Sequence, residues 1–182
     1  HKLAIKEDDE KVIMGFGGFY GYSKLIAENL FEHYRAQGLK IAILRASSIY
    51  GSHMSEDRLV ANFMSLAHKG KELKVMKPVG NRVNLIHASD VALAVLTVLK
   101  RQVWGTFNIA GPENVSIYEI AKYCVSSAAN GTIKVEENND NLIPFIRFDL
   151  DCSKAFRDFG YKAKVHAKEG ILEMAENKII IL

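Results

Sequence analysis

Helix-like and strand-like apolar patterns alternate along the whole chain, and this alternation limits the fold more than any other feature. Between residues 19 and 37 apolar side chains recur at helical spacing, and Gly38 then supplies a stop signal. The next segment, KIAILRAS at 40–47, is an apolar run rich in branched residues, which is typical of a buried strand. Helices that alternate with buried strands predict a layered α/β domain with parallel strands.

The same alternation continues to the end of the chain. Further helices are expected near 57–69, 90–100, 116–124, 151–160 and 165–177. Short strands are expected on both sides of the turn at 78–80, at 105–111 and around 134–137. Ser116 and Glu119 have the Ser-x-x-Glu spacing of a capping box, and Ser89 is expected to cap the helix that begins at Asp90.

Composition excludes several kinds of partner. The chain has 182 residues and a net charge of +3, and its basic residues are scattered, so no nucleic acid or anionic membrane is expected to bind. The apolar run VALAVL at 91–96 is too short to span a bilayer. Cys124 and Cys152 have no metal-ligand spacing, so we expect no metal site and reduced thiols in a cytoplasmic protein.

The glycine cluster GFGG at 15–18 invites comparison with a dinucleotide-binding fingerprint, G-x-G-x-x-G. The third glycine position is occupied by Tyr20, and no acidic residue follows at the distance where one would bind a ribose. We therefore interpret the cluster as a lead-in that lets the backbone bend before the helix. No other glycine cluster in the chain is expected to hold a pyrophosphate.

Tyr20 and Lys24 are four residues apart at the start of the first predicted helix, so both side chains lie on one face. A cation close to a phenol favours the phenolate, which can then exchange a proton with an alcohol or a carbonyl oxygen. The alternative is an ordinary amphipathic helix with a lysine on its surface.

The neighbouring residues favour the chemical interpretation. YGYSKLIAEN at 20–29 resembles the Y-G-x-S-K-x-x-x-E helix of the extended short-chain dehydrogenase/reductases, the NAD-dependent epimerase/dehydratase family. Four later segments resemble motifs of that family in the same order: LRASSIYG at 44–51, GNRVNLIHASDVALA at 80–94, GTFNIAGPENVSIYEIA at 105–121 and DCSKAFRDFGY at 151–161.

The resemblance implies a role for several residues. Tyr20 is expected to be the catalytic acid/base, and Lys24 is expected to bind the nicotinamide ribose of NAD or NADP and to favour the phenolate. Ala46 and Ser47 are expected to lie beside the nicotinamide, with Ser48 beside the substrate.

For the substrate, the resemblance implies a nucleotide-sugar. Arg82 is expected to reach its diphosphate, since a guanidinium group suits phosphate oxygens, and Arg147 is a second candidate. A surface arginine is the alternative for Arg82. His87 is expected to be a packed core histidine, and Asp90 is expected to favour its helix through the dipole.

Some positions depart from the family pattern. Ser48 stands where the family usually has asparagine, and Ser52 stands where it has proline. Both positions lie near the expected substrate, so a reductase of a non-sugar carbonyl compound stays open, as does a non-catalytic binding protein on the same fold.

The resemblance also predicts how the chain is organised. Only 19 residues precede Tyr20, whereas the family has a glycine-rich βαβ half and a catalytic serine or threonine before this tyrosine. We expect the C-terminal part of a Rossmann-like doubly wound parallel sheet, about 1–55 and 80–110, and the small substrate-binding lobe, about 56–79 and 111–182. The cofactor-binding loop is then not in this chain, and the 182 residues alone are expected to be inactive.

A homodimer through the helix of Tyr20 and Lys24 is a further implication of the resemblance. Four apolar residues of that helix are candidates for either this interface or the core: Leu25, Ile26, Leu30 and Phe31.

Overall fold

The computed structural model describes residues 4–11, 18–137 and 149–178. The helices of this part of the chain are α1 (Gly18–Ala36), α2 (Leu59–His68), α3 (Ala88–Arg101), α4 (Ile117–Ala128), α5 (Ser153–Phe159) and α6 (Ala167–Lys178). The strands are β1 (Ala42–Ala46), β2 (Ser48–Tyr50), β3 (Glu72–Met76), β4 (Arg82–His87), β5 (Gly105–Ile109), β6 (Asn114–Ser116) and β7 (Thr132–Glu136).

The strands pair mostly in parallel, as the apolar runs predict. β1 pairs with β5, β2 with β4 and β3 with β7, all in parallel, while β6 runs antiparallel to β4. Every residue of β5 is buried. The predicted α/β class is confirmed.

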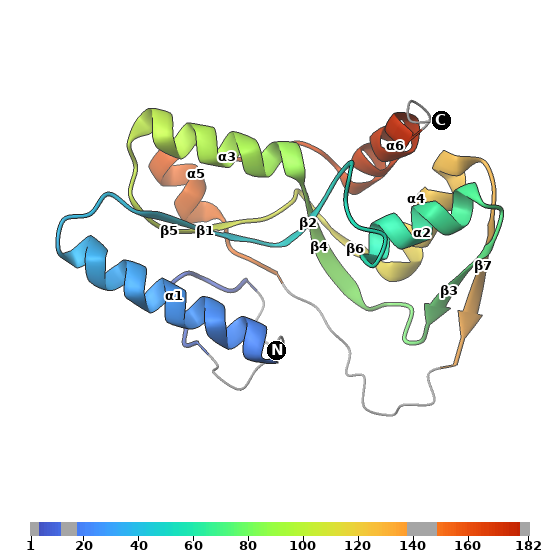
Figure 1. The fold of residues 1–182 in the computed structure, drawn as a ribbon, viewed down its shortest axis with the longest axis horizontal. Coiled ribbons are helices and arrows are strands. Elements are labelled where there is room, and N and C mark those ends of the chain that lie inside the picture. Colours follow the sequence, from blue (N-terminus) through green and yellow to red (C-terminus); the bar gives the residue numbers. More distant parts are fainter. Residues whose placement is uncertain (1–3, 12–17, 138–148, 179–182) are drawn as a thin grey trace.

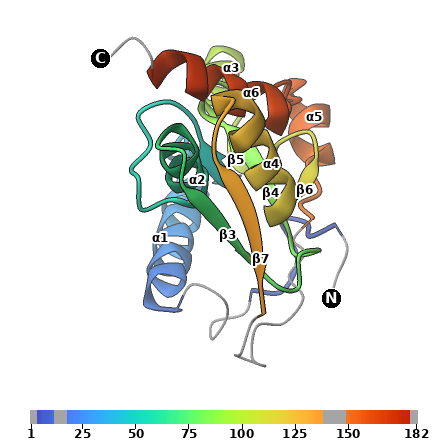
Figure 2. The same cartoon turned by 90° about the vertical axis from the view of Figure 1, so that its right-hand side faces the viewer.

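The chain forms two packed regions that β2, β4 and β6 connect (Figure 1). In the first region the β1–β5 pair lies between α1 on one side and α3 with α5 on the other (Figure 1). In the second region α2, α4 and α6 lie behind the β3–β7 pair (Figure 2). The cavities described below are formed mainly where these two regions meet.

Each region has its own apolar core. The first contains Phe107, whose ring meets Phe159 of α5 edge-on at a centroid distance of 5.1 Å. The second contains Met64 of α2 and Ile120 of α4. α5 thus packs with α3 and β5, although it lies within the range 111–182 that was predicted for the substrate-binding lobe.

The ends of the helices test the capping predictions. Ser116 and Glu119 form the predicted capping box of α4, and Gly160 ends α5 in the left-handed conformation at a φ of 69°. The prediction for Ser89 is wrong, because α3 already begins at Ala88. The capping acceptor is the His87 ring, which accepts a hydrogen bond from the Ser89 backbone N–H.

Within the ranges that the structure describes, no helix is both long enough and apolar enough to cross a membrane.

Candidate active site

One face of α1 lines a cavity of about 1080 Å³. Tyr20 and Lys24 lie one helical turn apart on this face, with Phe31 further along it. The Lys24 Nζ atom lies over the Tyr20 ring, 5.2 Å from its centroid. The Tyr20 side chain is accessible, since the residue is 70% exposed.

The other walls of the cavity come from β1, β2 and the beginning of α2. Ala46 ends β1, Ser47 follows it, and Ser48 begins β2, so these residues lie at the carboxyl end of a parallel strand. Ligands of open α/β sheets bind at this end of the strands. The structure therefore brings five predicted site residues to one cavity: Tyr20, Lys24, Ala46, Ser47 and Ser48.

Asn84 of β4 fixes the hydroxyl group of Ser47. Its side-chain oxygen accepts hydrogen bonds from Ser47 Oγ and from the Gly111 backbone N–H, each at 2.7 Å. Its amide nitrogen donates to the carbonyl oxygens of Gly111 and Glu113, each at 3.1 Å. Sequence reasoning missed this residue, and the only signal for it was a polar side chain inside an apolar strand.

A second residue without a predicted role, Glu28, holds α1 against β1. Its carboxylate accepts from Arg45 Nε at 3.0 Å and from Arg45 Nη2 at 2.8 Å, and Lys11 Nζ lies 3.1 Å away. Burial raises the pKa of this carboxyl group, but the hydrogen bonds and charges of Arg45 and Lys11 outweigh burial and hold the pKa below its ordinary value. The pair fixes α1, and with it Lys24, relative to the strand.

Arg82 does not line this cavity. Its guanidinium group lies over the start of α4, where Nη2 is 3.3 Å from a Glu119 carboxylate oxygen and Nη1 is 3.4 Å from the Asn114 carbonyl oxygen. The structure thus separates Arg82 from Tyr20 and Lys24. The other predicted arginine, Arg147, lies outside the described residues.

His87 and Asp90 lie where β4 passes into α3. His87 is buried, as predicted, and its ring meets the Tyr50 ring edge-on at 5.2 Å. Asp90 does more than favour its helix: its carboxylate accepts hydrogen bonds from the backbone N–H groups of Lys164 and Val165 at 2.9–3.1 Å. Asp90 thus connects α3 to the segment that leads into α6.

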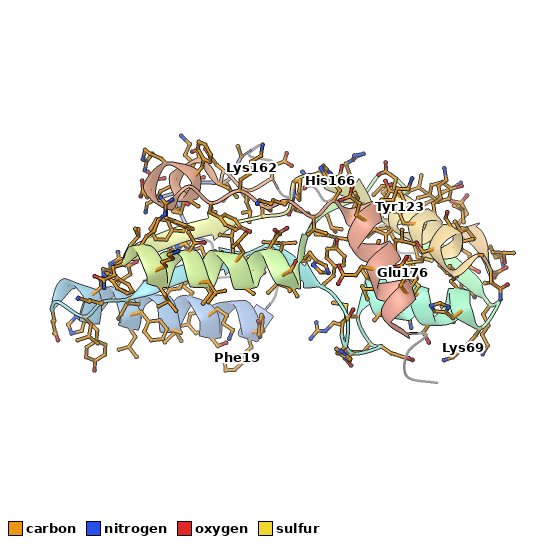
Figure 3. The ribbon with its side chains drawn as sticks, turned by 90° about the horizontal axis from the view of Figure 1, so that it is seen from above. Phe19, Lys69, Tyr123, Lys162, His166 and Glu176 are labelled. Atoms are coloured by element: carbon orange, nitrogen blue, oxygen red, sulfur yellow. The ribbon has the colours of Figure 1, made fainter. Side chains whose placement is uncertain are left out.

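A second cavity, of about 980 Å³, lies between the end of β5 and the segment that joins α5 to α6. Figure 3 shows Lys162 and His166 on this segment. Glu113 on the opposite wall is 3.2 Å from the His166 ring. None of the predicted site residues that the structure describes lines this cavity, so the candidate active site is the cavity beside α1.

The sequence and the site identify the family. A profile of the NAD dependent epimerase/dehydratase family matches residues 5–110, which is more than half of the chain. The chain therefore belongs to this family.

Individual relatives are enzymes that act on nucleotide-sugars. The chain is 30% identical to a UDP-glucuronic acid decarboxylase of Arabidopsis thaliana, over 90% of this chain and 48% of the relative. It is 28% identical to a dTDP-D-glucose 4,6-dehydratase of Homo sapiens, over 86% of this chain and 46% of the relative. The chain thus spans about half the length of the relatives that it matches.

Solved structures show the same fold. A UDP-glucuronic acid 4-epimerase of Bacillus cereus, in complex with UDP-glucuronic acid and NAD, is similar with a TM-score of 0.83 at 21% identity, covering 100% of this chain and 58% of the epimerase. A UDP-N-acetylglucosamine 4-epimerase of the same species gives a TM-score of 0.75 at 25% identity, over 87% and 53% of the two chains. The predicted Rossmann-like architecture is confirmed.

Proposed function

We propose that the protein is an NAD(P)-dependent enzyme of nucleotide-sugar metabolism that uses Tyr20 and Lys24 for acid/base chemistry. One observation carries the proposal: these two side chains share a cavity with the residues at the carboxyl end of β1. Epimerisation, dehydration, decarboxylation and reduction each begin or end with a hydroxyl or a carbonyl group of the substrate. That group would lie beside the Tyr20–Lys24 pair.

The residues of the cavity suit the nicotinamide end of the cofactor. Lys24 would donate hydrogen bonds to the ribose hydroxyls, and Ala46 and Ser47 would form a wall beside the ring. When bound, the nicotinamide supplies a hydride acceptor or donor. No described residue is proposed to bind the phosphate groups of the cofactor.

The protein's own chemistry is proton transfer. A Tyr20 phenolate accepts the proton of a substrate hydroxyl as that carbon is oxidised, and the phenol returns it when the carbonyl is reduced. The Ser47 hydroxyl group lies in the same cavity, with its proton donated to Asn84.

A second candidate is a reductase of a non-sugar carbonyl compound. One observation favours it: Arg82, expected to bind the sugar diphosphate, instead contacts Glu119 outside the cavity. Binding of UDP, GDP and dTDP separates the candidates, because such a reductase should bind none of them.

Two further properties belong to the proposal. The protein is proposed to form a homodimer through α1, and the unpaired thiols of Cys124 and Cys152 support a cytoplasmic location.

The acid/base role is tested by Tyr20→Phe in the full-length gene product. Turnover should fall by about a hundred- to ten-thousandfold, because the proton has no acceptor, while NAD(P) affinity should stay within a few fold. Tyr22→Phe is the matched control, since Tyr22 is on the same helix but does not line the cavity. Undiminished turnover by Tyr20→Phe would show that another group moves the proton.

A further inference from the structure

We infer that the second cavity binds a small aromatic acid, a molecule with a flat ring and a carboxylate or phosphate group. This cavity is separate from the candidate active site, because the two cavities share no lining residue. Strand β4 lies between them: side chains alternate along a strand, so Val83 and Leu85 line the first cavity while Asn84 lines the second. The second site is therefore independent of the proposed function.

The size and the apolar wall of the second cavity suit a small organic ligand. Its volume is about 980 Å³, and ligand pockets of proteins commonly measure roughly 300–1,000 Å³. Its apolar lining includes Pro112, Leu150 and Phe156. The Phe156 residue is 62% exposed, so its ring is accessible to a flat ring of the ligand.

The wall of the second cavity also contains a buried hydroxyl group that lacks a partner. Tyr161 lines the cavity and is only 4% exposed. Its hydroxyl group has no hydrogen-bond partner within the part of the chain that the structure describes. A buried polar group without a partner costs free energy, so most such groups in proteins are paired. A polar atom of a ligand in this cavity would give the hydroxyl group its partner.

The two carboxylates of the described lining are already engaged within the protein. Glu113 accepts a hydrogen bond from the Ala167 backbone N–H at 3.3 Å, and it lies 3.2 Å from the His166 ring nitrogen. The Asp149 carboxylate accepts from the side-chain amide of Asn114. Neither carboxylate therefore favours a cationic ligand.

The lysines of the second cavity lack such partners. Lys162 and Lys164 are exposed residues of the segment between α5 and α6, and neither ammonium group forms an ion pair with a carboxylate in the described ranges. Lys162 and His166 lie on the same side of the molecule (Figure 3). The segment itself is anchored, since the Lys164 backbone N–H donates to Asp90 at 3.0 Å. Two unpaired cations beside an apolar wall favour a ligand with an anionic group and a ring.

The test measures dissociation constants by ligand-observed NMR on the full-length gene product. Four probes separate the parts of the ligand: 4-hydroxybenzoate and phenyl phosphate carry a ring and an anion, phenol carries the ring alone, and inorganic phosphate carries the anion alone. The wild type should bind at least one aromatic acid with a Kd of about 0.1–1 mM, and phenol and phosphate about tenfold more weakly. The tighter acid shows whether the site prefers a carboxylate or a phosphate.

A double variant tests the two cations. Lys162→Gln combined with Lys164→Gln should weaken the aromatic acid by about tenfold, because the charge-assisted hydrogen bonds are lost, and should leave phenol unchanged. Lys168→Gln is the matched control, since Lys168 is an exposed lysine of α6 that lines neither cavity. Thermal unfolding verifies that each variant is folded.

Two single variants test the wall of the cavity. Phe156→Ala should weaken the aromatic acid by about three- to tenfold, because the ring of the ligand loses an aromatic contact. Tyr161→Phe should weaken it by a similar factor without lowering the unfolding temperature. A hydroxyl group that has no partner in the free protein contributes no hydrogen bond to its stability.

The site is supported if the double lysine variant loses affinity for the acid while Lys168→Gln keeps it. A wild type that binds neither aromatic acid would overturn the inference, and so would a double variant that binds as tightly as the wild type. Equal weakening by Lys168→Gln would also overturn it, because the loss would then reflect only the total charge of the protein.

Discussion

At the scale of single residues, Asp90 connects two segments that are far apart in the sequence. The residue is 97% buried, and its carboxylate accepts backbone hydrogen bonds from a segment 74 residues away. A buried carboxylate is costly unless its oxygens are paired. The two N–H groups of Lys164 and Val165 provide that pairing, so Asp90 fastens the start of α3 to the approach to α6.

Asp90→Asn should lower the free energy of unfolding by about 1–3 kcal/mol. Asparagine offers one acceptor oxygen, and its amide group places a donor against one of the two N–H groups. Urea unfolding of the purified protein measures the change, with Asp8→Asn at an exposed position as the control. An unaltered midpoint for Asp90→Asn would mean that these hydrogen bonds contribute nothing net.

At the scale of elements, the local signal of the sequence was sufficient for α4. Ser116 accepts from the Glu119 N–H at 3.1 Å, and the Glu119 carboxylate accepts from the Ser116 N–H at 2.7 Å. These hydrogen bonds, reinforced by Arg82 and Lys122, hold the pKa of Glu119 below its ordinary value of 4.5. The stabilisation is thus fully present above pH 4.5 and is lost as the pH falls through the lower, folded-state pKa.

Glu119→Gln tests this linkage, because glutamine keeps an acceptor oxygen but cannot titrate. The wild type should be more stable than the variant by about 0.5–1 kcal/mol at pH 7, and this difference should shrink below pH 4.5. Unfolding by urea at a series of pH values measures it. Ser126→Ala, at an exposed position in the last turn of α4, should have no effect. A difference that stays constant down to pH 3 would contradict the assigned linkage.

Elements whose signals are local could be predicted, while those that depend on distant contacts could not. The capping box and the glycine that ends α5 each act within a few residues, and both predictions hold. The ring of His87 replaced Ser89 as a cap because the helix begins earlier than its apolar pattern indicates. The packing of α5 on β5 depends on Phe107 and Phe159, which are far apart in the sequence.

The candidate site also contains some residues that local sequence patterns could predict and others that they could not. Tyr20 and Lys24 share one helical motif, so their common face could be predicted from spacing alone. Asn84 contacts Ser47 through the fold, and no motif of the chain encodes this contact. Arg82 was assigned from a motif, yet a carboxylate on another element determines where its guanidinium group lies.

At the scale of the whole molecule, α1 has two different faces. Tyr20, Lys24 and Phe31 line the cavity. A residue two positions along a helix is turned by about 200°, so the opposite face carries a ridge of exposed apolar side chains at a spacing of four: Tyr22, Ile26, Leu30 and Tyr34. α1 lies at the edge of the molecule (Figure 1), and the Phe19 side chain at its beginning points outward (Figure 3).

This ridge is the proposed homodimer interface, and a substitution within it tests the dimer. Ile26→Glu should convert a dimer into a monomer, because a carboxylate buried in an apolar contact between two helices loses its hydration without gaining a partner. The fold of the monomer should be preserved, since Ile26 is 51% exposed. Sedimentation velocity of the full-length gene product over a range of concentrations measures the association.

Phe156→Glu is the control for a general effect of added charge. Phe156 is a 62% exposed apolar residue on α5, away from the ridge, so its replacement should leave the dimer intact. A wild type that sediments as a monomer, or an Ile26→Glu variant that remains dimeric, would exclude α1 as the interface. Because the cavity and the ridge are on one helix, loss of the dimer should also reduce substrate turnover if the partner α1 helps to hold Tyr20 and Lys24 in place.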